Sequence, residues 1–134
     1  MLKKIALSCL ALTMCSTLAA GEQSQMRKKV AIITNFSETD AAAHSLVKNF
    51  TDTLEMSTPR NIAFQHDYYW AGGNIDAAKS HAKRIVSSQP DAIFAATTPV
   101  VRALLQETKT IPIVFATVAD PVGSGFVENL ATPG

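Results

Sequence analysis

The chain has 134 residues, with 12 basic and 11 acidic side chains and a formal net charge of +1 at pH 7. A near-neutral chain without a basic stripe excludes nucleic acid as an expected partner. Both cysteines, Cys9 and Cys15, lie at the start of the chain. Beyond them the sequence offers no disulfide, no thiol nucleophile and no cysteine ligand for a metal.

Residues 1–21 have the pattern of a cleaved secretory signal peptide. Two lysines are followed by a mostly apolar stretch up to Leu18, and small residues at 19–21 suit signal peptidase. The apolar stretch is shorter than the roughly 20 residues of a transmembrane helix. An uncleaved membrane anchor and a lipoprotein are the alternatives. We therefore expect a periplasmic protein, with residues 22–29 as a short leader before the first strand.

From residue 30 onward, short apolar runs alternate with amphipathic segments. The runs rich in β-branched and apolar residues predict strands at 30–33, 62–69, 92–96 and 111–118. Apolar residues at helical spacing predict a helix after each of the first three strands. In the second helix the inward side chains are expected to be Ile75, Ala78, Ala82, Ile85 and Val86.

Two of these helices have recognisable start signals. Ser37 to Asp40 resembles a capping box, with Ser37 as the N-cap and an acid three residues later. Thr98 is the expected N-cap of the third helix, with Pro99 at its first helical position.

The order βαβαβαβ predicts an α/β fold with a Rossmann-like parallel sheet and right-handed crossovers. If the strand order is 2-1-3-4, the first helix covers one face and the other two helices cover the opposite face. Strands three and four would then be bare on the side of the first helix. Both strands are apolar on both faces, with Ile93, Phe94, Ile113, Val114 and Phe115. We expect such a patch to make the isolated mature chain prone to association.

Hydrogen-bonding side chains follow the first, third and fourth strands where each strand ends. Together with one aromatic residue, Phe36, they form the set of candidate ligand-binding residues: Asn35, Phe36, Thr97, Thr98, Thr117 and Asp120. Carboxyl ends of parallel strands meet at one edge, where α/β proteins bind ligands. The helix that begins near Thr98 directs unpaired N–H groups to the same edge, which suits a carboxylate or phosphate. The alternative is that Ser37, Thr97 and Thr98 only cap helices.

Other conspicuous residues carry less functional information. The aromatic run at 68–70 is either a stacking wall for a ligand or edge-strand packing, and its place on the second strand favours packing. His44, His66 and His81 lack the spacing of metal ligands, so no metal site is expected. The glycine-bearing loops contain neither GxGxxG nor a P-loop lysine, and no Gly-x-Ser-x-Gly elbow is present. We expect neither a cofactor nor enzymatic activity.

Three segments carry a resemblance to a known family: KKVAIITNF, RNIAFQHDYYWAGGN, and SSQPDAIFAATTPVV continuing to the closing LATPG. The most specific features are the threonine pair that opens a helix, the strand IPIVF and the DPV loop. The chain resembles the N-terminal part of substrate-binding proteins of bacterial ABC transporters, in the family that includes tryptophan- and tyrosine-binding receptors. This implies a type I periplasmic-binding-protein fold, in which two α/β lobes joined by crossing strands close on a ligand.

The resemblance also implies a function. The chain would be the solute-binding component of an ABC uptake transporter, binding a small polar ligand such as an aromatic amino acid and serving an ABC permease in the inner membrane. By position, Thr97 and Thr98 would contact the ligand by hydroxyl and backbone, Asn35 and Phe36 would line the first strand's tip, and Asp120 would meet an amino or hydroxyl group.

Residues 30–134 correspond to the N-terminal lobe alone. The C-terminal lobe is absent from this sequence, so a truncated receptor is expected, since closure around a ligand needs two bodies. Two alternatives stay open at this point: a small exported flavodoxin-like enzyme or cofactor carrier, and a non-functional gene remnant.

Overall fold

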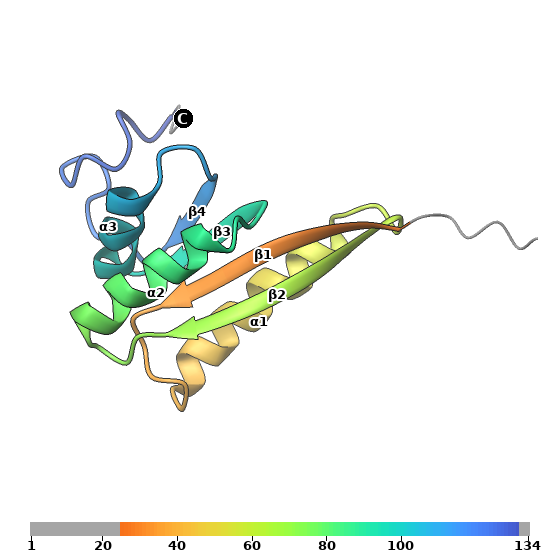
Figure 1. Cartoon of the computed structure of the whole chain (residues 1–134), viewed down its shortest axis with the longest axis horizontal. Coiled ribbons are helices and arrows are strands. Elements are labelled where there is room, and N and C mark those ends of the chain that lie inside the picture. Colours follow the sequence, from red (N-terminus) through yellow and green to blue (C-terminus); the bar gives the residue numbers. More distant parts are fainter. Residues whose placement is uncertain (1–24, 132–134) are drawn as a thin grey trace, which may run out of the picture.

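The computed structural model describes residues 25–131, which form a four-stranded parallel sheet flanked by helices on both faces (Figure 1). The strands are β1 (Met26–Thr34), β2 (Ile62–Trp70), β3 (Ala92–Ala96) and β4 (Ile113–Ala116). The helices are α1 (Ala41–Met56), α2 (Ile75–Ser87) and α3 (Thr98–Glu107). The predicted βαβαβαβ order is confirmed, and the strand order is β2-β1-β3-β4, the order assumed above for the placement of the helices. The predicted signal peptide, residues 1–21, lies outside the described residues.

Three strands differ from their predicted bounds, β2 only by the addition of Trp70. β1 begins at Met26, so residues 26–29, which were expected to belong to a leader, pair with the start of β2. β4 spans only 113–116 of the predicted 111–118. Among the strands of the described region it pairs with the five-residue β3 alone, and the paired register ends where β3 ends. The length of β4 is therefore limited by its neighbour rather than by its own apolar run.

Two helix starts also differ. Asp40, not Ser37, is the N-cap of α1, and its Oδ1 accepts a hydrogen bond from the N–H of Ala43 at 2.9 Å. The carbonyl of Ser37 instead accepts from the N–H of Asp40 at 3.1 Å, which closes a turn before the helix. In α3 the N-cap is Thr97, one residue before the predicted Thr98, and its side chain makes no capping bond.

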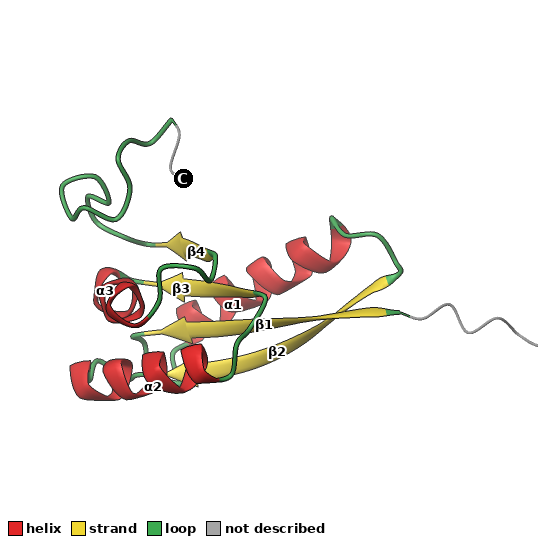
Figure 2. Cartoon of the chain, turned by 45° about the horizontal axis from the view of Figure 1, so that its top comes forward, coloured by secondary structure: helices red, strands yellow, loops and turns green. Residues whose placement is uncertain are grey.

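A separate hydrophobic core lies on each face of the sheet, and Figure 2 shows α1 on one side and α2 with α3 on the other. Alternation along β1 supplies both cores, because Ile32 faces α1 and Ile33 faces α2 and α3, with both side chains almost fully buried. In α2 the predicted inward residues Ala78, Ala82 and Ile85 are completely buried. Ile75 is not, and its side chain is 60% exposed.

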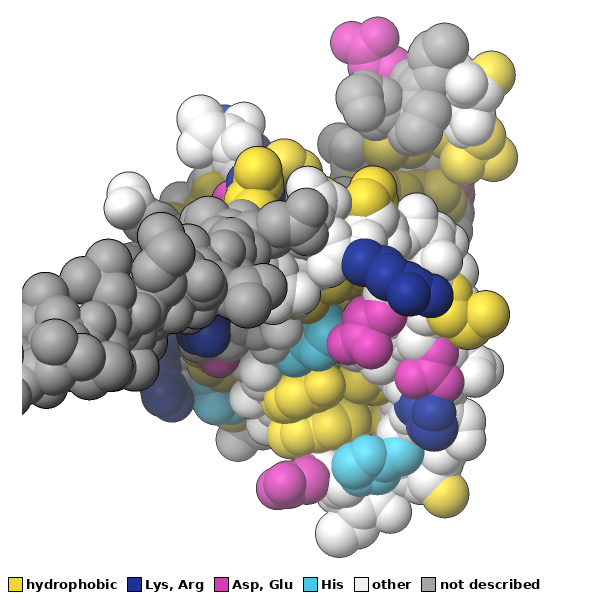
Figure 3. All heavy atoms as spheres, turned by 90° about the vertical axis from the view of Figure 1, so that its right-hand side faces the viewer, with side chains coloured by type: hydrophobic (Ala, Val, Ile, Leu, Met, Phe, Trp, Pro, Cys, Tyr) yellow, Lys and Arg dark blue, Asp and Glu magenta, His cyan; other side chains and the backbone are white. Residues whose placement is uncertain are grey.

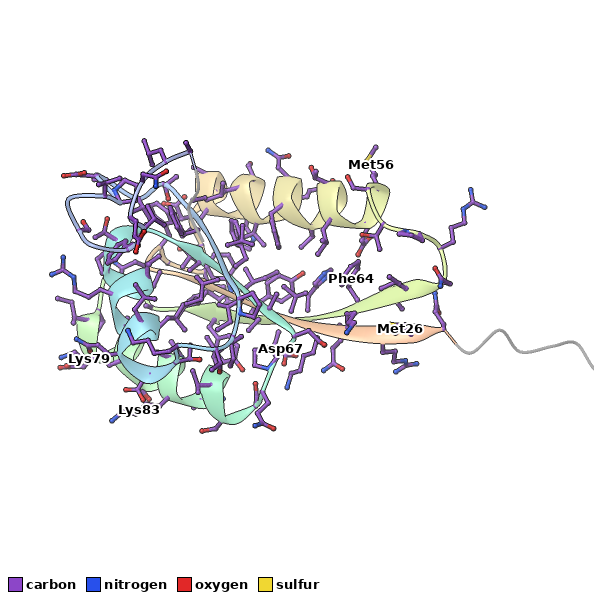
Figure 4. All side chains as sticks on the ribbon, turned by 90° about the horizontal axis from the view of Figure 1, so that it is seen from above. Met26, Met56, Phe64, Asp67, Lys79 and Lys83 are labelled. Atoms are coloured by element: carbon purple, nitrogen blue, oxygen red, sulfur yellow. The ribbon has the colours of Figure 1, made fainter. Side chains whose placement is uncertain are left out.

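The face covered by α1 is only partly open. Phe94 of β3 was expected to be bare, but it is 4% exposed because its ring stacks on Phe50 of α1 at a centroid distance of 4.0 Å. That expectation is wrong for β3, since α1 reaches across β1 to cover it. It holds for β4, where Val114 is 53% exposed. Figure 4 shows Phe64 of β2 between its strand and α1, and Met56 at the end of that helix.

The surface of the described region mixes side-chain types. Its exposed large hydrophobic side chains are scattered over several elements and include Met26, Tyr68 and Leu130. Figure 3 shows hydrophobic side chains gathered next to histidine and acidic side chains on one side of the molecule. Within residues 25–131, no helix combines the length and hydrophobicity needed to cross a bilayer.

Candidate functional site

The ends of β1, β3 and β4 lie side by side at one edge of the sheet, because their last residues are paired in register. Asn35, Thr97 and Thr117 are the residues that directly follow these three strands. The N–H of Thr97 donates to the carbonyl of Ala116 at 3.0 Å, which extends the contact between β3 and β4 to the edge. The sheet thus brings together the tips that the sequence analysis selected.

Two buried polar atoms at this edge have no hydrogen-bond partner among the described residues. They are Oδ1 of Asn35 and Oγ1 of Thr97. A buried polar atom without a partner costs about 1–3 kcal/mol, so most such groups in folded proteins are satisfied. Asn35 and Thr97 follow adjacent strands, and a polar ligand at this edge would supply the missing partners.

The start of α3 adds a positive electrostatic contribution to the same edge. The first turn of a helix leaves backbone N–H groups without helical partners, and the helix dipole favours an anion there. The Thr98 hydroxyl neither caps the helix nor points freely into the site. Its Oγ1 accepts a hydrogen bond from the N–H of Ala119 at 3.3 Å. Thr98 therefore ties the loop after β4 to the start of α3.

The backbone at this edge is strained. Thr97 has φ 86°, Thr117 has φ 51° and Asp120 has φ 43°. A non-glycine residue rarely adopts positive φ, least of all a β-branched one, and each such residue costs about 1–3 kcal/mol. Residues of this kind cluster at ligand sites, where the surrounding structure holds them in place.

Asp120 and Thr117 use their side chains locally. Oδ1 of Asp120 accepts from the N–H of Gly123 at 2.8 Å, and the Asp120 carbonyl accepts from the N–H of Ser124 at 2.9 Å. The Asp120 side chain leaves no room for a Cβ at Gly123. The Thr117 hydroxyl donates to the carbonyl of Ala116 at 2.8 Å. Both residues are exposed, whereas Asn35, Phe36, Thr97 and Thr98 are half-buried.

Two glycines that follow β2 hold the backbone of the residues directly after β1. The N–H of Gly73 donates to the carbonyl of Asn35 at 2.6 Å, and the N–H of Gly72 donates to the carbonyl of Phe36 at 3.1 Å. Gly72 has a φ of +60° and Gly73 a φ of +79°, a backbone conformation that favours glycine at both positions. Sequence reasoning recognised the turn but not this contact, because it joins residues almost forty positions apart.

The aromatic run packs against neighbouring helices. The Trp70 ring lies 4.9 Å from that of His44, between centroids, on the α1 side. On the opposite face Tyr69 lies 5.5 Å from His81 and beneath the Arg84 guanidinium at 5.8 Å. These contacts account for the buried part of the run as packing. Among residues 25–131, no three His, Cys, Asp or Glu side chains gather in a way that could hold a metal ion.

Comparison with known proteins shows the family to which the chain belongs. A sequence model of the ABC transporter substrate binding proteins matches residues 29–134. The chain belongs to this family. A tyrosine-binding protein of Clostridioides difficile is 38% identical over 68 residues, which are 51% of this chain and 20% of that protein.

Solved structures agree on the fold. A substrate-binding protein with adhesive properties from Clostridium difficile, in its ligand-free open form, superposes with a TM-score of 0.68 at 32% identity. A conserved domain protein from Vibrio cholerae gives 0.66 at 35% identity. The ABC domain from Streptococcus pneumoniae in complex with L-Trp gives 0.70 at 22% identity, which supports the fold alone.

These matches cover 80%, 77% and 81% of this chain but only 36%, 34% and 36% of the solved chains. This family member therefore spans about a third of the length of the structures it matches.

Proposed function

We propose that this chain forms one lobe of the solute-binding component of an ABC uptake transporter, and that the lobe provides one wall of an amino-acid site. The edge formed by the ends of β1, β3 and β4 is the ligand-facing surface. In this proposal the protein is exported by its signal peptide, works in the periplasm and serves a permease in the inner membrane.

One observation carries the proposal. Within residues 25–131 the buried Oδ1 of Asn35 and Oγ1 of Thr97 have no hydrogen-bond partner, and they lie at the same edge as the N-terminus of α3. An amino acid carries complementary groups. Its ammonium can donate to both oxygens, and its carboxylate can accept N–H bonds at the helix start. The apolar ring of Phe36, also at this edge, suits contact with the ligand side chain.

The names of the related proteins suggest which class of ligand to test. One is named for tyrosine binding, and one solved neighbour is a complex with L-Trp. We therefore propose an aromatic amino acid as the first ligand to test. The family and the relatives named for a ligand are binding proteins rather than enzymes, which favours a receptor over the enzyme or cofactor carrier that the α/β alternation alone allows.

The test is a thermal-shift screen of the full-length receptor against the twenty amino acids. A ligand that binds only the folded state raises the stability by about 2.7 kcal/mol at a concentration one hundred times its Kd. We expect the largest increases in melting temperature with L-tryptophan or L-tyrosine. No shift with any amino acid, together with a shift by a nucleotide or flavin, would favour the cofactor carrier instead.

A further inference from the structure

The outer edge of β2 presents backbone hydrogen-bonding groups that the sheet does not use. β2 stands at one end of the strand order β2-β1-β3-β4 and pairs with β1 over its full nine residues. Figure 2 shows β2 as the outermost strand on its side of the sheet. No strand among residues 25–131 pairs with its other edge. Such an edge is a template on which a further strand can add.

The hydrogen bonds at the two ends of β2 show which of its residues face outward. The carbonyl of Asn61 accepts from the N–H of Met26, and the N–H of Ala71 donates to the carbonyl of Thr34. Successive residues of a paired strand direct their N–H and C=O groups alternately toward the neighbour and away from it. The odd-numbered residues of β2 therefore face β1. The outward-facing residues are the even-numbered ones: Ile62, Phe64, His66, Tyr68 and Trp70.

This edge lacks the features by which proteins usually prevent edge-to-edge pairing. Those features are short edge strands, prolines, bulges and exposed charges, above all lysine. β2 is long, contains neither proline nor lysine, and follows β1 without a bulge. Its single carboxylate, on Asp67, lies 3.4 Å from Nζ of Lys29 and is paired with it. A regular and unprotected edge of this length indicates that another strand covers it in the assembled protein.

We propose that two copies of the protein pair antiparallel through β2, about a two-fold axis at His66, so that four strands from each copy form one continuous sheet. In an antiparallel ladder the residues that exchange hydrogen bonds must both face the partner. With His66 at the axis, Phe64 lies opposite Tyr68 of the second copy, and Ile62 lies opposite Trp70. All of these residues face outward, and this register pairs the whole strand. Two-fold dimers are the commonest closed assemblies of identical chains.

The same register places complementary side chains opposite each other on both faces of β2. Phe64 and Asp67, both labelled in Figure 4, belong to opposite faces. On the face of Asp67, the Gln65 side chain of one copy lies opposite Asp67 of the other. Within one copy the Gln65 amide donates to Asp67 at 3.4 Å, which leaves its second N–H for the other carboxylate. On the face of Phe64 the cross-strand pair with Tyr68 is aromatic, and pairs of both kinds stabilise sheets.

A hollow beside this edge adds contact area to the strand pairing. It lies between α1 and β2, has a volume of about 360 Å³, and is lined in part by Val47, Tyr68 and Trp70. Tyr68 is 49% exposed there. In the proposed register the second copy places its Ile62 and Phe64 on this same face, beside the two aromatic rings. Dimerisation would therefore bury an aromatic surface that a single copy leaves open to water.

The experiment measures the mass of the full-length receptor in solution by sedimentation and light scattering, at concentrations up to about 100 μM, where an interface of modest size is populated. Tyr68→Pro removes one outward N–H and keeps the bonds to β1, because an edge strand tolerates proline where its N–H faces solvent. Tyr68→Lys is a second disrupting variant, since lysine on an edge strand opposes pairing. Tyr68→Phe is the matched control, because it keeps both the ring and the N–H group.

We expect a wild-type dimer and a weaker dimer for both disrupting variants. Tyr68→Pro removes two hydrogen bonds per dimer, one from each copy, so the dissociation constant of the dimer should rise about thirtyfold. Tyr68→Lys should raise it at least about tenfold, and Tyr68→Phe should stay within about threefold of wild type. The affinity for L-tryptophan and L-tyrosine, measured by calorimetry, should be the same in all four proteins, because β2 is not one of the strands whose ends form the ligand edge.

Cysteine pairing tests the register. We mix receptor that carries Gln65→Cys with receptor that carries Asp67→Cys and oxidise the mixture. These two positions lie opposite each other, as a pair without mutual hydrogen bonds and with Cα atoms about 4.5 Å apart, within reach of a disulfide. Like positions are displaced by two residues along the strand, about 8 Å apart, which is too far for a disulfide. The mixture should therefore give cross-linked dimers, and neither variant alone should do so.

Three results would overturn the β2 dimer: a receptor that stays monomeric at every concentration, a dimer that neither Tyr68→Pro nor Tyr68→Lys weakens, or a mixture that cross-links no better than the single variants. None of these results bears on the amino-acid site. The dimer in turn does not depend on the proposed function, which fails separately if the wild-type receptor binds neither amino acid.

Discussion

The stacking of Phe94 on Phe50 gives the most quantitative prediction for this lobe, because it joins α1 to the centre of the sheet. Phe94 is 4% exposed, and the two ring centroids are 4.0 Å apart. Replacing a buried Phe by Ala costs about 3–5 kcal/mol. Both rings also line a hollow of about 470 Å³ beside α1, so part of the new space can collapse or fill with water. We therefore expect Phe94→Ala to cost about 3 kcal/mol, the lower end of that range.

The assay is urea unfolding of the full-length receptor, with Phe94→Leu and Met56→Ala as companions. A cost of 3 kcal/mol is a large part of the 5–15 kcal/mol that stabilises a typical protein, and lowers the urea midpoint by about 1–3 M. Phe94→Leu keeps most of the apolar volume and should cost about 1.5 kcal/mol. Met56 is 86% exposed, so Met56→Ala should stay within about 0.5 kcal/mol. The reasoning is refuted if Phe94→Ala unfolds at the same midpoint as Met56→Ala.

Three further predictions concern charge, capping and exposed surface. The pKa of Asp91 lies below its ordinary value of 3.8, mainly because the carboxylate accepts a hydrogen bond from the backbone N–H of Lys29. The stability that this carboxylate contributes is therefore present above about pH 4 and is lost as the pH falls through the folded-state pKa. Asp91→Asn should flatten that acid limb in pH-dependent urea unfolding, and an unchanged limb would contradict the assignment. Asp40→Ala should lower the free energy of unfolding by about 1 kcal/mol because it removes the N-cap of α1, whereas Ser37→Ala should change it by no more than about 0.5 kcal/mol. Equal losses for the two variants in urea unfolding would favour the capping box that begins at Ser37. The isolated segment 25–134 should bind an apolar dye and associate on size-exclusion chromatography, and Val114→Lys should reduce both; a monodisperse segment with a cooperative thermal transition and no dye binding would contradict this.

The sequence was sufficient for the architecture because each element there is marked locally. β3 was predicted at its observed bounds, since a continuous apolar run lies between Pro90-Asp91 and Thr97-Thr98. Right-handed crossovers place α1 on one face and α2 with α3 on the other once the strand order is β2-β1-β3-β4. The tips of β1, β3 and β4 then meet whatever their detailed geometry. This is why Asn35 could be placed at the common edge in advance.

The detailed geometry of the site depends on contacts that are distant in sequence. Nothing in a threonine side chain signals the positive φ of Thr97 and Thr117, the residues that directly follow β3 and β4. Ser37 and Asp40 are both good N-caps, and the turn after β1 decides between them. The hydrogen bond from the N–H of Gly123 to the side chain of Asp120 likewise depends on the conformation of the loop after β4, which its amino-acid composition does not specify.

The most direct test of the account is calorimetric titration of the full-length receptor with L-tryptophan and L-tyrosine, comparing wild type with Thr97→Val and Asn35→Ala. Valine keeps the β-branched shape of Thr97 and removes only the hydroxyl, so the backbone strain is retained. Thr53→Val, on the exposed side of α1, is the matched control. Each lost hydrogen bond is worth about 1 kcal/mol or more, so both site variants should bind about tenfold more weakly while the control matches wild type. Wild-type affinity in both site variants would contradict the claim that this edge binds the ligand.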